Sequence, residues 1–410
     1  MRVKPAPRRL LGLALLAALL GASVIVSYTV FTRPFPGFND YMTPWEAARS
    51  FFYDGLDPYS AETSLNIQQR LYGRPAGPDD QPNHFAYPFY ALFVAWPLIH
   101  VDYAWATAVW LVLNQALLVG ALLLLLNLYG WQPRPLALAG LLLFTLLNYP
   151  AARGLLLGQV SHLAYFLQVL ALWSLARRRD RLAGLALALS TFKPQMGVFL
   201  VPFLLLWGLR ARRWRFVASF TALTAALLAL SFALQPGWLA GFAAQLTLYP
   251  SYIEVSTPAW VLAQYLLGLG QAAELALNAA GLALLLWAWH TVLARGRTER
   301  FWWTVMVTLT VTHLIGLRTA TPHLVVLTIP LVFYLRALAR QGRGWGAAAL
   351  LLALLLLPWL HFLLTLGGGK FEHPTLLLPL PLLALAALWL TRRQWWAAPV
   401  PAPPDGGFAG

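Results

Sequence analysis

The sequence predicts an all-α polytopic membrane protein with about 12 membrane helices. Of its 410 residues, 60% are of apolar or aromatic types and only 10% are charged, whereas about a quarter of a soluble domain is charged. Apolar runs of roughly 20 residues, the length that crosses a bilayer core, recur along the chain. Short basic clusters separate these runs. The composition excludes a cytosolic enzyme, a disordered chain and a small secreted scaffold.

The net charge of +15 does not indicate a nucleic-acid partner. The 29 basic residues gather between apolar runs, where cytoplasmic loops carry the charges that orient a membrane protein. The 19 Trp and 15 Tyr residues suit the headgroup level of a bilayer. The chain has no Cys, which excludes a thiol nucleophile and a Cys-ligated metal.

The first element is an apolar run that follows a basic start and ends near Phe31. It is long enough to span a membrane and lacks a small-residue cleavage site, so it predicts an uncleaved helix with a cytoplasmic N-terminus. Residues 32–84 hold half of the acidic residues and predict an extracytoplasmic loop. Within this loop, Thr43 as N-cap and Pro44 at the first position predict a short interfacial helix that ends near Gly55.

The remaining elements follow from the apolar runs and the basic clusters between them. The runs cover residues 85–99, 103–128, 134–150, 156–176, 182–209, 214–234, 271–294, 300–316, 322–338, 345–366 and 374–391. The clusters at 177–181, 210–215, 295–300, 336–343 and 392–393 are expected to be cytoplasmic. Residues 235–270 are expected to form a second extracytoplasmic loop, and residues 397–410 a disordered cytoplasmic tail.

Two apolar runs cannot be simple membrane spans if every basic cluster is to lie in the cytoplasm. Residues 85–99 are short and contain Pro88 and Pro97, so we expect them to dip into the outer face and return. Residues 182–209 lie between two basic clusters and are interrupted at Lys193-Pro194, which predicts a hairpin of two half-length helices. A single tilted helix with one Arg cluster outside is the alternative. If residues 182–209 form a hairpin, residues 1–396 are expected to form one membrane domain, with both termini in the cytoplasm.

This topology collects lone cations on the outer side. Arg153 and Arg318 stand apart from the cytoplasmic clusters, and Lys193 lies at the tip of the hairpin. A lone cation near the membrane is costly and needs a reason, which an anionic partner such as a lipid phosphate would supply. His323 follows Pro322 at a helix start, where the positive helix end favours an anion. Anchoring to headgroups is the simpler interpretation of Arg153, and snorkelling that of Lys193.

The outer side also holds polar residues that are candidates for substrate binding. Asp40 lies just beyond the first helix, where it serves either as a functional acid or as a helix cap. Asp57 is better explained by a turn, and His162 by packing. No phosphate-binding loop, zinc helix or nucleophile elbow is present. The candidate substrate-binding residues are Asp57, Tyr59, His84, Tyr87, Gln159, His162 and Gln195.

Five motifs, in this order, resemble glycosyltransferase family 87 of the membrane GT-C superfamily. They are Asp40 followed by Gly55-Leu56-Asp57-Pro58-Tyr59, Phe85-Ala86-Tyr87-Pro88, Gly158-Gln159-Val160-Ser161-His162, Phe192-Lys193-Pro194-Gln195 and Thr319-Ala320-Thr321-Pro322-His323. The resemblance covers about residues 10–340. It implies a GT-C-like helical bundle, an active site at the outer face, a polyprenyl-phosphate-mannose donor and an inverting transfer. It also implies that Asp40 is the base and that His323 has a functional role. Phe89 stands where the family often has a second Pro.

The residue inventory fits this chemistry. An inverting transfer needs one base, and the departing phosphate needs cations or oriented N–H groups. Arg153, Lys193, Arg318 and His323 are the candidates for phosphate binding. We expect no metal and no cofactor, because a monophosphate leaving group needs less metal assistance than a diphosphate. The expected partners are the lipid-linked sugar, membrane lipids and a glycolipid or glycan acceptor, in the cell membrane. A transporter or flippase of lipid-linked sugars and a non-catalytic scaffold are the alternatives.

Overall fold

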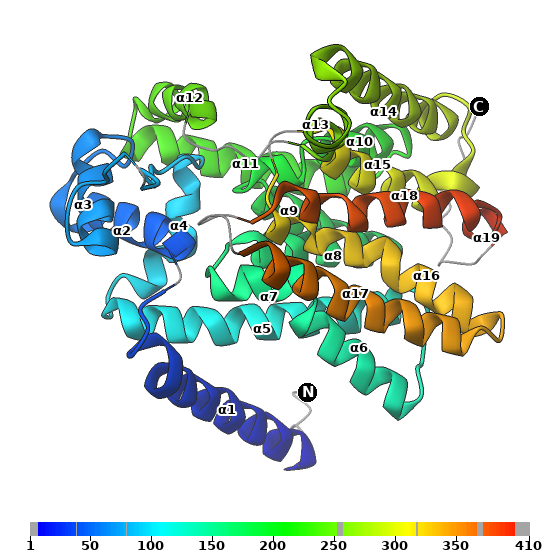
Figure 1. Ribbon diagram of the computed structural model, residues 1–410, viewed down its shortest axis with the longest axis horizontal. Helices are drawn as coiled ribbons and strands as arrows, with labels where there is room; N and C mark the ends of the chain where they lie inside the picture. Colours follow the sequence, from blue (N-terminus) through cyan, green and yellow to red (C-terminus); the bar gives the residue numbers. More distant parts are fainter. Residues whose placement is uncertain are drawn as a thin grey trace. The chain divides into compact units, whose positions relative to one another are not determined.

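The computed structural model describes residues 7–37, 39–78, 80–251, 257–316, 319–366 and 372–397. Over these residues the chain consists of α-helices joined by short 3-10 and π turns, without a strand (Figure 1). It divides into two compact units. Unit 1 comprises residues 1–85, 91–117 and 155–159, and unit 2 comprises residues 86–90, 118–154 and 160–410. The expectations for Arg318 and for a tail after Ala397 fall outside the described residues.

Unit 1 begins with the predicted first helix. Helix α1 (Pro7–Ser27) continues through the π turn η1 (Tyr28–Thr32), and this stretch is apolar and long enough to cross a membrane. Its leucines are exposed, as expected for side chains that face lipid rather than protein. The end of the helix is fastened by Thr32, whose Oγ1 donates a hydrogen bond to the Ala104 carbonyl at 2.7 Å.

The helix of the first loop starts one turn earlier than the sequence predicted. Helix α2 (Asn39–Asp54) already includes Asp40 in its first turn and carries Pro44 in its interior, so the assignment of Thr43 as N-cap is wrong. Pro44 removes the hydrogen bond to the carbonyl four residues before it and crowds the preceding turn, and packing of the buried Tyr41 and Trp45 rings supports this turn. The predicted end is confirmed, because Gly55 adopts a φ of +68°.

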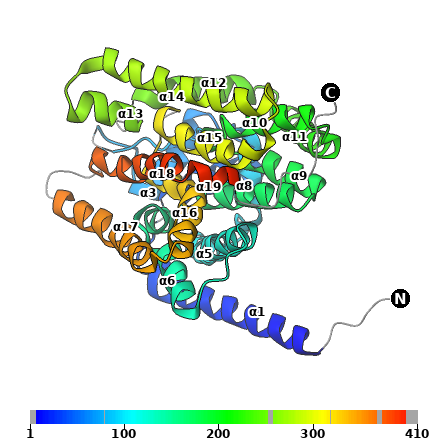
Figure 2. The ribbon, with the colours of Figure 1, turned by 90° about the vertical axis from the view of Figure 1, so that its right-hand side faces the viewer.

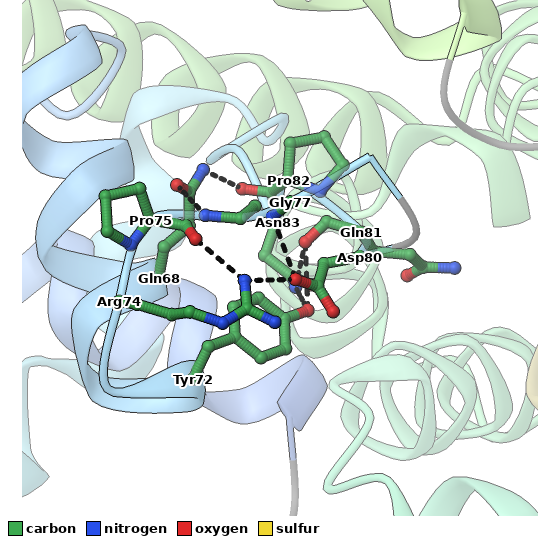
Figure 3. A network of polar contacts seen from close by, with 10 residues as sticks. Gln68, Tyr72, Arg74, Pro75, Gly77, Asp80, Gln81, Pro82 and Asn83 are labelled. Atoms are coloured by element: carbon green, nitrogen blue, oxygen red, sulfur yellow. Dashed lines mark hydrogen bonds and ion pairs between the residues drawn. The ribbon is translucent and has the colours of Figure 1, made fainter.

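Helix α3 (Ala61–Tyr72) packs against α2 and anchors the loop that follows it. Ser60 caps its start by accepting a hydrogen bond from the Thr63 N–H. The loop turns back on itself through polar contacts, shown in Figure 3: Arg74 pairs with Asp80 at 2.6 Å, and the Gln68 Nε2 donates to the Pro82 carbonyl at 2.8 Å. These contacts hold the loop against α3 and so fix the place where His84 and Phe85 begin the next segment.

The segment at 85–99 is short, as predicted. Its helical part runs through η2 (Phe89–Ala91), α4 (Leu92–Ala95) and η3 (Trp96–Leu98), which together are too short to cross a bilayer. Helix α5 (Tyr103–Leu128) follows, with the bounds that the apolar run predicted. Its first half belongs to unit 1 and its second half to unit 2.

Unit 2 opens with a bent helix pair. Helices α6 (Pro135–Leu147) and α7 (Tyr149–Leu156) meet at an angle of 48° and together are apolar enough for one span. The predicted run at 134–150 therefore extends further, to Leu156. Helix α8 (Ser161–Ala176) is mostly buried and packs against α9 and the turn η8 (Thr321–Leu327).

The break at Lys193 produces the predicted pair of half-length helices. Helices α9 (Asp180–Ser190) and α10 (Leu200–Arg210) flank the short turn η4 (Pro194–Met196). Asp180, at the start of α9, forms a bidentate ion pair with Arg213, just beyond α10. One straight helix would hold these residues about 50 Å apart at 1.5 Å per residue. The chain therefore reverses direction, which excludes the single tilted helix.

Close packing at a glycine supports α9, the first helix of this hairpin. Helix α9 packs against α8 and α11 (Trp214–Leu234), as Figure 2 shows. A Cβ added to Gly184 would lie 2.3 Å from the Ser219 Oγ and 2.4 Å from the Phe216 carbonyl oxygen. The absence of a side chain at Gly184 thus lets the backbones of α9 and α11 approach, as small residues do in membrane helix pairs.

The predicted loop at 235–270 contains helices of its own. These are α12 (Trp238–Leu248), η5 (Tyr249–Ser251), α13 (Pro258–Trp260) and the π turn η6 (Val261–Leu266). The apolar runs did not predict these helices, because none of them is long enough to span a bilayer. Residues 252–256, including Glu254, lie outside the described part. Helix α14 (Gly270–Leu293) then matches the next apolar run and lies beside α15 (Figure 2).

The C-terminal helices separate into buried and exposed ones. Helix α15 (Phe301–Ile315) and the segment formed by η8 and α16 (Thr328–Arg340) are almost wholly buried, whereas α17 (Gly344–Thr365) has no buried residue. The turns and helices η7 (Thr298–Arg300), η10 (Pro374–Leu377), α18 (Pro379–Leu390) and α19 (Arg392–Ala397) complete the chain. Among the described residues, six helices are long and apolar enough to span a membrane, or seven with the bent pair. The count of 12 is not confirmed.

Candidate functional site

Asp40 lies in the first turn of α2 and is held by the turn that precedes α8. The Gln159 Nε2 donates a hydrogen bond to the Asp40 Oδ2 at 2.6 Å, and the Asp40 N–H donates to the Leu157 carbonyl at 3.2 Å. Both contacts are within unit 1. The carboxylate sits at the positive end of the helix dipole, which stabilises its negative charge. Side chain and backbone of Asp40 are thus both positioned, as a reacting group requires.

The residues that hold Asp40 form a glycine turn. Gly158 has a φ of +64°, a conformation that costs little only for glycine, and it places Leu157 and Gln159 on either side of the bend. Its carbonyl accepts a hydrogen bond from the Trp110 Nε1 at 2.8 Å. Gln159 itself is 8% exposed. The Gly158-Gln159 motif therefore brings a buried amide to the acid, although the two are 119 positions apart in sequence.

The other candidates in unit 1 make local contacts. The Asp57 Oδ1 accepts from the Tyr59 N–H at 2.9 Å, which is the turn geometry expected of Asp. The buried Tyr59 ring packs on Phe85. His84 Nδ1 lies 2.8 Å from the Ser64 Oγ on α3, and burial lowers the pKa of its imidazole. These contacts explain the fold of the first loop, and substrate binding by these residues stays a prediction.

Lys193 is the centre of a second group, in unit 2. Its side chain is only 1% exposed, and its Nζ lies 5.7 Å from the centre of the Tyr87 ring, a cation–π contact. Its charge acts on the imidazoles of both His162 and His323. Gln195 is half-buried two residues further on, in η4. The break between α9 and α10 thus places a buried cation in a group that contains two histidines.

His162 is packed against a glycine of α7. The ring is fully buried, and a Cβ added to Gly154 would lie 2.6 Å from its Nε2 and 3.2 Å from the Pro322 Cβ. Gly154 therefore permits helix α7, His162 and the turn before His323 to meet at one point. The predicted set includes His162, but the role of Gly154 is visible only in the fold.

His323 is held by its own backbone. Its Nδ1 accepts a hydrogen bond from the Ala320 N–H at 3.1 Å. Because that nitrogen accepts, the neutral ring carries its proton on Nε2, which is a donor. The side chain is 5% exposed. This arrangement gives the Lys193 group an oriented N–H donor in addition to the ammonium.

Arg153 forms an ion pair with an acid that was not among the candidate residues. Its Nε lies 2.8 Å from the Glu372 Oε1. The same carboxylate accepts hydrogen bonds from the Tyr149 hydroxyl at 2.7 Å and the Thr321 hydroxyl at 2.6 Å. The positive charge of Arg153 is therefore balanced by a side chain of the protein itself, so the fold accounts for this cation without an anionic ligand.

Two buried or half-buried groups in unit 2 were missed. Glu372 follows the segment 367–371 and was not among the candidate site residues, since nothing in its neighbourhood in sequence indicates its three partners. His313 lies in α15, 2% exposed, with its Nδ1 3.0 Å from the Leu309 carbonyl, and its charge would act on His323. A titratable residue inside an apolar run is a signal that could have identified His313.

These residues could together support the transfer of a group away from an anionic leaving group. Unit 1 holds an oriented carboxylate, and unit 2 holds a buried cation with an N–H donor. Within the described residues, no group of three or more His, Asp and Glu side chains is arranged to hold a metal ion.

A comparison with known protein families identifies the family of this chain. The sequence profile of glycosyltransferase family 87 matches residues 85–316, more than half of the chain, including Arg153, Lys193 and the Gly158 to His162 motif. Asp40 and His323 lie outside the match. None of the curated proteins and none of the solved structures matches the chain. With its apolar spanning helices and this match, the chain belongs to glycosyltransferase family 87 and is a multi-pass membrane glycosyltransferase.

Proposed function

We propose that this glycosyltransferase moves mannose, or another hexose, from a polyprenyl-phosphate-linked donor to an acceptor at the outer face of the cell membrane, with inversion at the anomeric carbon. The observation that carries the proposal is that the family motifs single out an oriented carboxylate, Asp40 of unit 1, and a buried cation, Lys193 of unit 2. The termini lie in the cytoplasm in this proposal. The acceptor is a glycolipid or a glycan.

Asp40 is the base in this proposal. It takes the proton of the acceptor hydroxyl while the acceptor oxygen bonds to the anomeric carbon and the bond from that carbon to the phosphate oxygen breaks. One carboxylate suffices because no covalent glycosyl-enzyme forms. The Gln159 Nε2 donates a hydrogen bond to the Asp40 Oδ2, which fixes the orientation of the carboxylate that accepts the proton.

Lys193 and His323 stabilise the leaving group. A polyprenyl-phosphate sugar carries one negative charge, and its departure leaves a phosphate monoester on which a second negative charge develops. A buried ammonium acts strongly on such a charge because little water screens it, and the Nε2–H of His323 adds an oriented donor. This set of donors requires no metal, so the proposed reaction persists in the presence of a chelator.

The test is sugar transfer by the full-length protein in lipid nanodiscs. The assay supplies radiolabelled polyprenyl-phosphate-mannose and a membrane-lipid extract as acceptor. We expect labelled product from the wild type, and a decrease of about 100-fold or more in Asp40→Asn, the usual consequence of losing a general base. Asp54→Asn is the matched control, since it makes the same change at an exposed site at the other end of α2.

The outcomes separate the parts of the proposal. Equal activity of Asp40→Asn and Asp54→Asn would remove Asp40 from the role of base. Activity with a different lipid-linked hexose would replace mannose but keep the mechanism. Absence of transfer from any lipid-linked donor, together with movement of labelled lipid across a vesicle membrane, would favour a flippase.

A further inference from the structure

Glu372 joins two segments that carry the candidate donor-phosphate residues. Its carboxylate accepts hydrogen bonds from Thr321, two residues before His323, and from Arg153 and Tyr149 on helix α7. All of these residues belong to unit 2. The side chains of Arg153 and Glu372 are 26% and 17% exposed, so solvent screens this pair less than it would a surface ion pair.

The contacts of Glu372 fasten the turn that carries His323. The Thr321 hydroxyl lies 2.6 Å from the Glu372 Oε2, while the Oε1 lies 2.8 Å from the Arg153 Nε. One carboxylate oxygen therefore holds the turn and the other holds α7. The same two segments touch at Gly154, where an added Cβ would lie 3.2 Å from the Pro322 Cβ. The hydrogen bonds and this packing together fix the distance between α7 and the turn.

The segment that follows Glu372 is also held by hydrogen bonds. His373 Nδ1 lies 2.6 Å from the Thr375 Oγ1, and its Nε2 lies 3.0 Å from the Tyr265 hydroxyl in η6. His361 of α17 reaches the same Thr375 Oγ1 at 2.7 Å. Glu372 is therefore the end of a segment held at several points, rather than a solvated acid at a loop tip.

We propose that Glu372 is a positioning residue of the donor-phosphate site: its carboxylate holds the turn of His323 against α7 and balances the charge of Arg153. The inference rests on the proposed function, because it assigns the purpose of this geometry to phosphate binding by His323. Glu372 does not touch the donor, since a carboxylate would repel the phosphate. It acts through Thr321 on the direction in which the His323 Nε2–H points.

The experiment measures binding of polyprenyl monophosphate, the leaving group, to the full-length protein in nanodiscs, so that no turnover is needed. Thr321→Val removes the hydrogen bond to the turn at nearly constant volume. Glu372→Asp keeps the charge that balances Arg153 but shortens the side chain by one methylene, so that it no longer spans both partners. Glu274→Asp is the matched control, because Glu274 is half-buried in unit 2 and bonded to Gln264 but distant in sequence from the candidate site.

Each variant is made with His323 present and in a His323→Gln background. We expect Thr321→Val and Glu372→Asp to weaken binding about fivefold when His323 is present and less than about twofold in His323→Gln, the non-additivity of residues that act through one another. Glu274→Asp changes the dissociation constant in neither background.

Two results would overturn the inference alone. Equal weakening in both backgrounds would mean that Glu372 supports the fold without acting through His323. No weakening by either variant, with His323→Gln itself weakening binding, would mean that the turn holds its position without Glu372. If the wild type does not bind polyprenyl monophosphate, or if His323→Gln does not alter its binding, the donor-phosphate assignment itself fails and the inference falls with it.

Discussion

Replacement of Gly154 by alanine tests whether close packing shapes the Lys193 site. The new methyl group would lie 2.6 Å from the His162 Nε2, 2.8 Å from its Cε1 and 3.2 Å from the Pro322 Cβ. The first distance is roughly 1 Å shorter than van der Waals contact. The His162 ring is fully buried and has no solvent into which it can retreat, so the ring, the turn at Pro322 or helix α7 must move.

The expected loss of stability in Gly154→Ala follows from a comparison with a second glycine. Gly140 lies in α6, and a Cβ there meets nothing within 4 Å. Both substitutions gain helix propensity, up to about 1 kcal/mol, but only Gly154→Ala overpacks a filled space, which costs about 1–3 kcal/mol. We therefore expect Gly154→Ala to be less stable than Gly140→Ala by about 1–3 kcal/mol. The displaced His162 and Pro322 also predict weaker binding of polyprenyl monophosphate.

The assay is unfolding in nanodiscs, with lipid-phosphate binding measured on the same samples. Gly154→Ala is compared with Gly140→Ala, each with His162 intact and in a His162→Ala background. The penalty at Gly154 is expected to shrink to less than about 0.5 kcal/mol when the ring is absent, because the clash is then gone. A Gly154→Ala variant as stable as Gly140→Ala, or a penalty that persists without the ring, would refute the reasoning.

Three further predictions concern charged and titratable groups. Lys193→Met is expected to raise the KM for the donor at least about tenfold, because it removes the buried charge that the proposal assigns to the donor phosphate; an unchanged KM in the folded variant would contradict this. Burial lowers the pKa of His84, so the folded state resists protonation whereas the unfolded state takes up a proton near pH 6.5 (about the ordinary value). The stability of α3 should therefore be full above about pH 6.5 and decline as the pH falls below it. Hydrogen exchange of residues 61–72, corrected for intrinsic rates, measures this, and a decline of equal size in His84→Gln would contradict it. Asp180→Asn should destabilise the hairpin by about 1–3 kcal/mol, since it weakens a bidentate ion pair with Arg213; thermal unfolding measures the loss, and an unchanged midpoint would show that the two helix ends need no such contact.

The sequence predicted the elements whose cause is local. A run of apolar residues of bilayer length needs no partner to be recognised, so α5 and α11 were located to the residue. The hairpin was predicted from charge on both sides and a Lys-Pro break within, and the contact of Asp180 with Arg213 agrees with it. The start of α2 was misplaced because proline is tolerated where the first turn is supported by packing rather than by capping.

The site was only partly predictable, because its contacts join distant positions. Gln159 and Asp40 both stood among the candidates, but the hydrogen bond between them spans 119 positions and depends on the bend at Gly158. Arg153 was selected as an unexplained cation, and the fold supplies the explanation at Glu372, 219 positions away. A lone charge in a sequence indicates that a partner exists, but whether the partner is a side chain or a ligand is decided only when the helices pack.

The breaks in the helices bear on the choice between transfer and transport. Transporters place discontinuous helices at corresponding positions of two repeats, so that a central site opens alternately to either side. Here the 48° bend between α6 and α7 and the reversal between α9 and α10 both fall between residues 135 and 210. Instead, the reversal at η4 brings Lys193 near His162 and His323, and Gly154 and Glu372 fix the segments around them. Alternating access would have to break this packing in each cycle, whereas the proposed transfer needs it to stay in place, which is why the geometry favours an enzyme over a carrier.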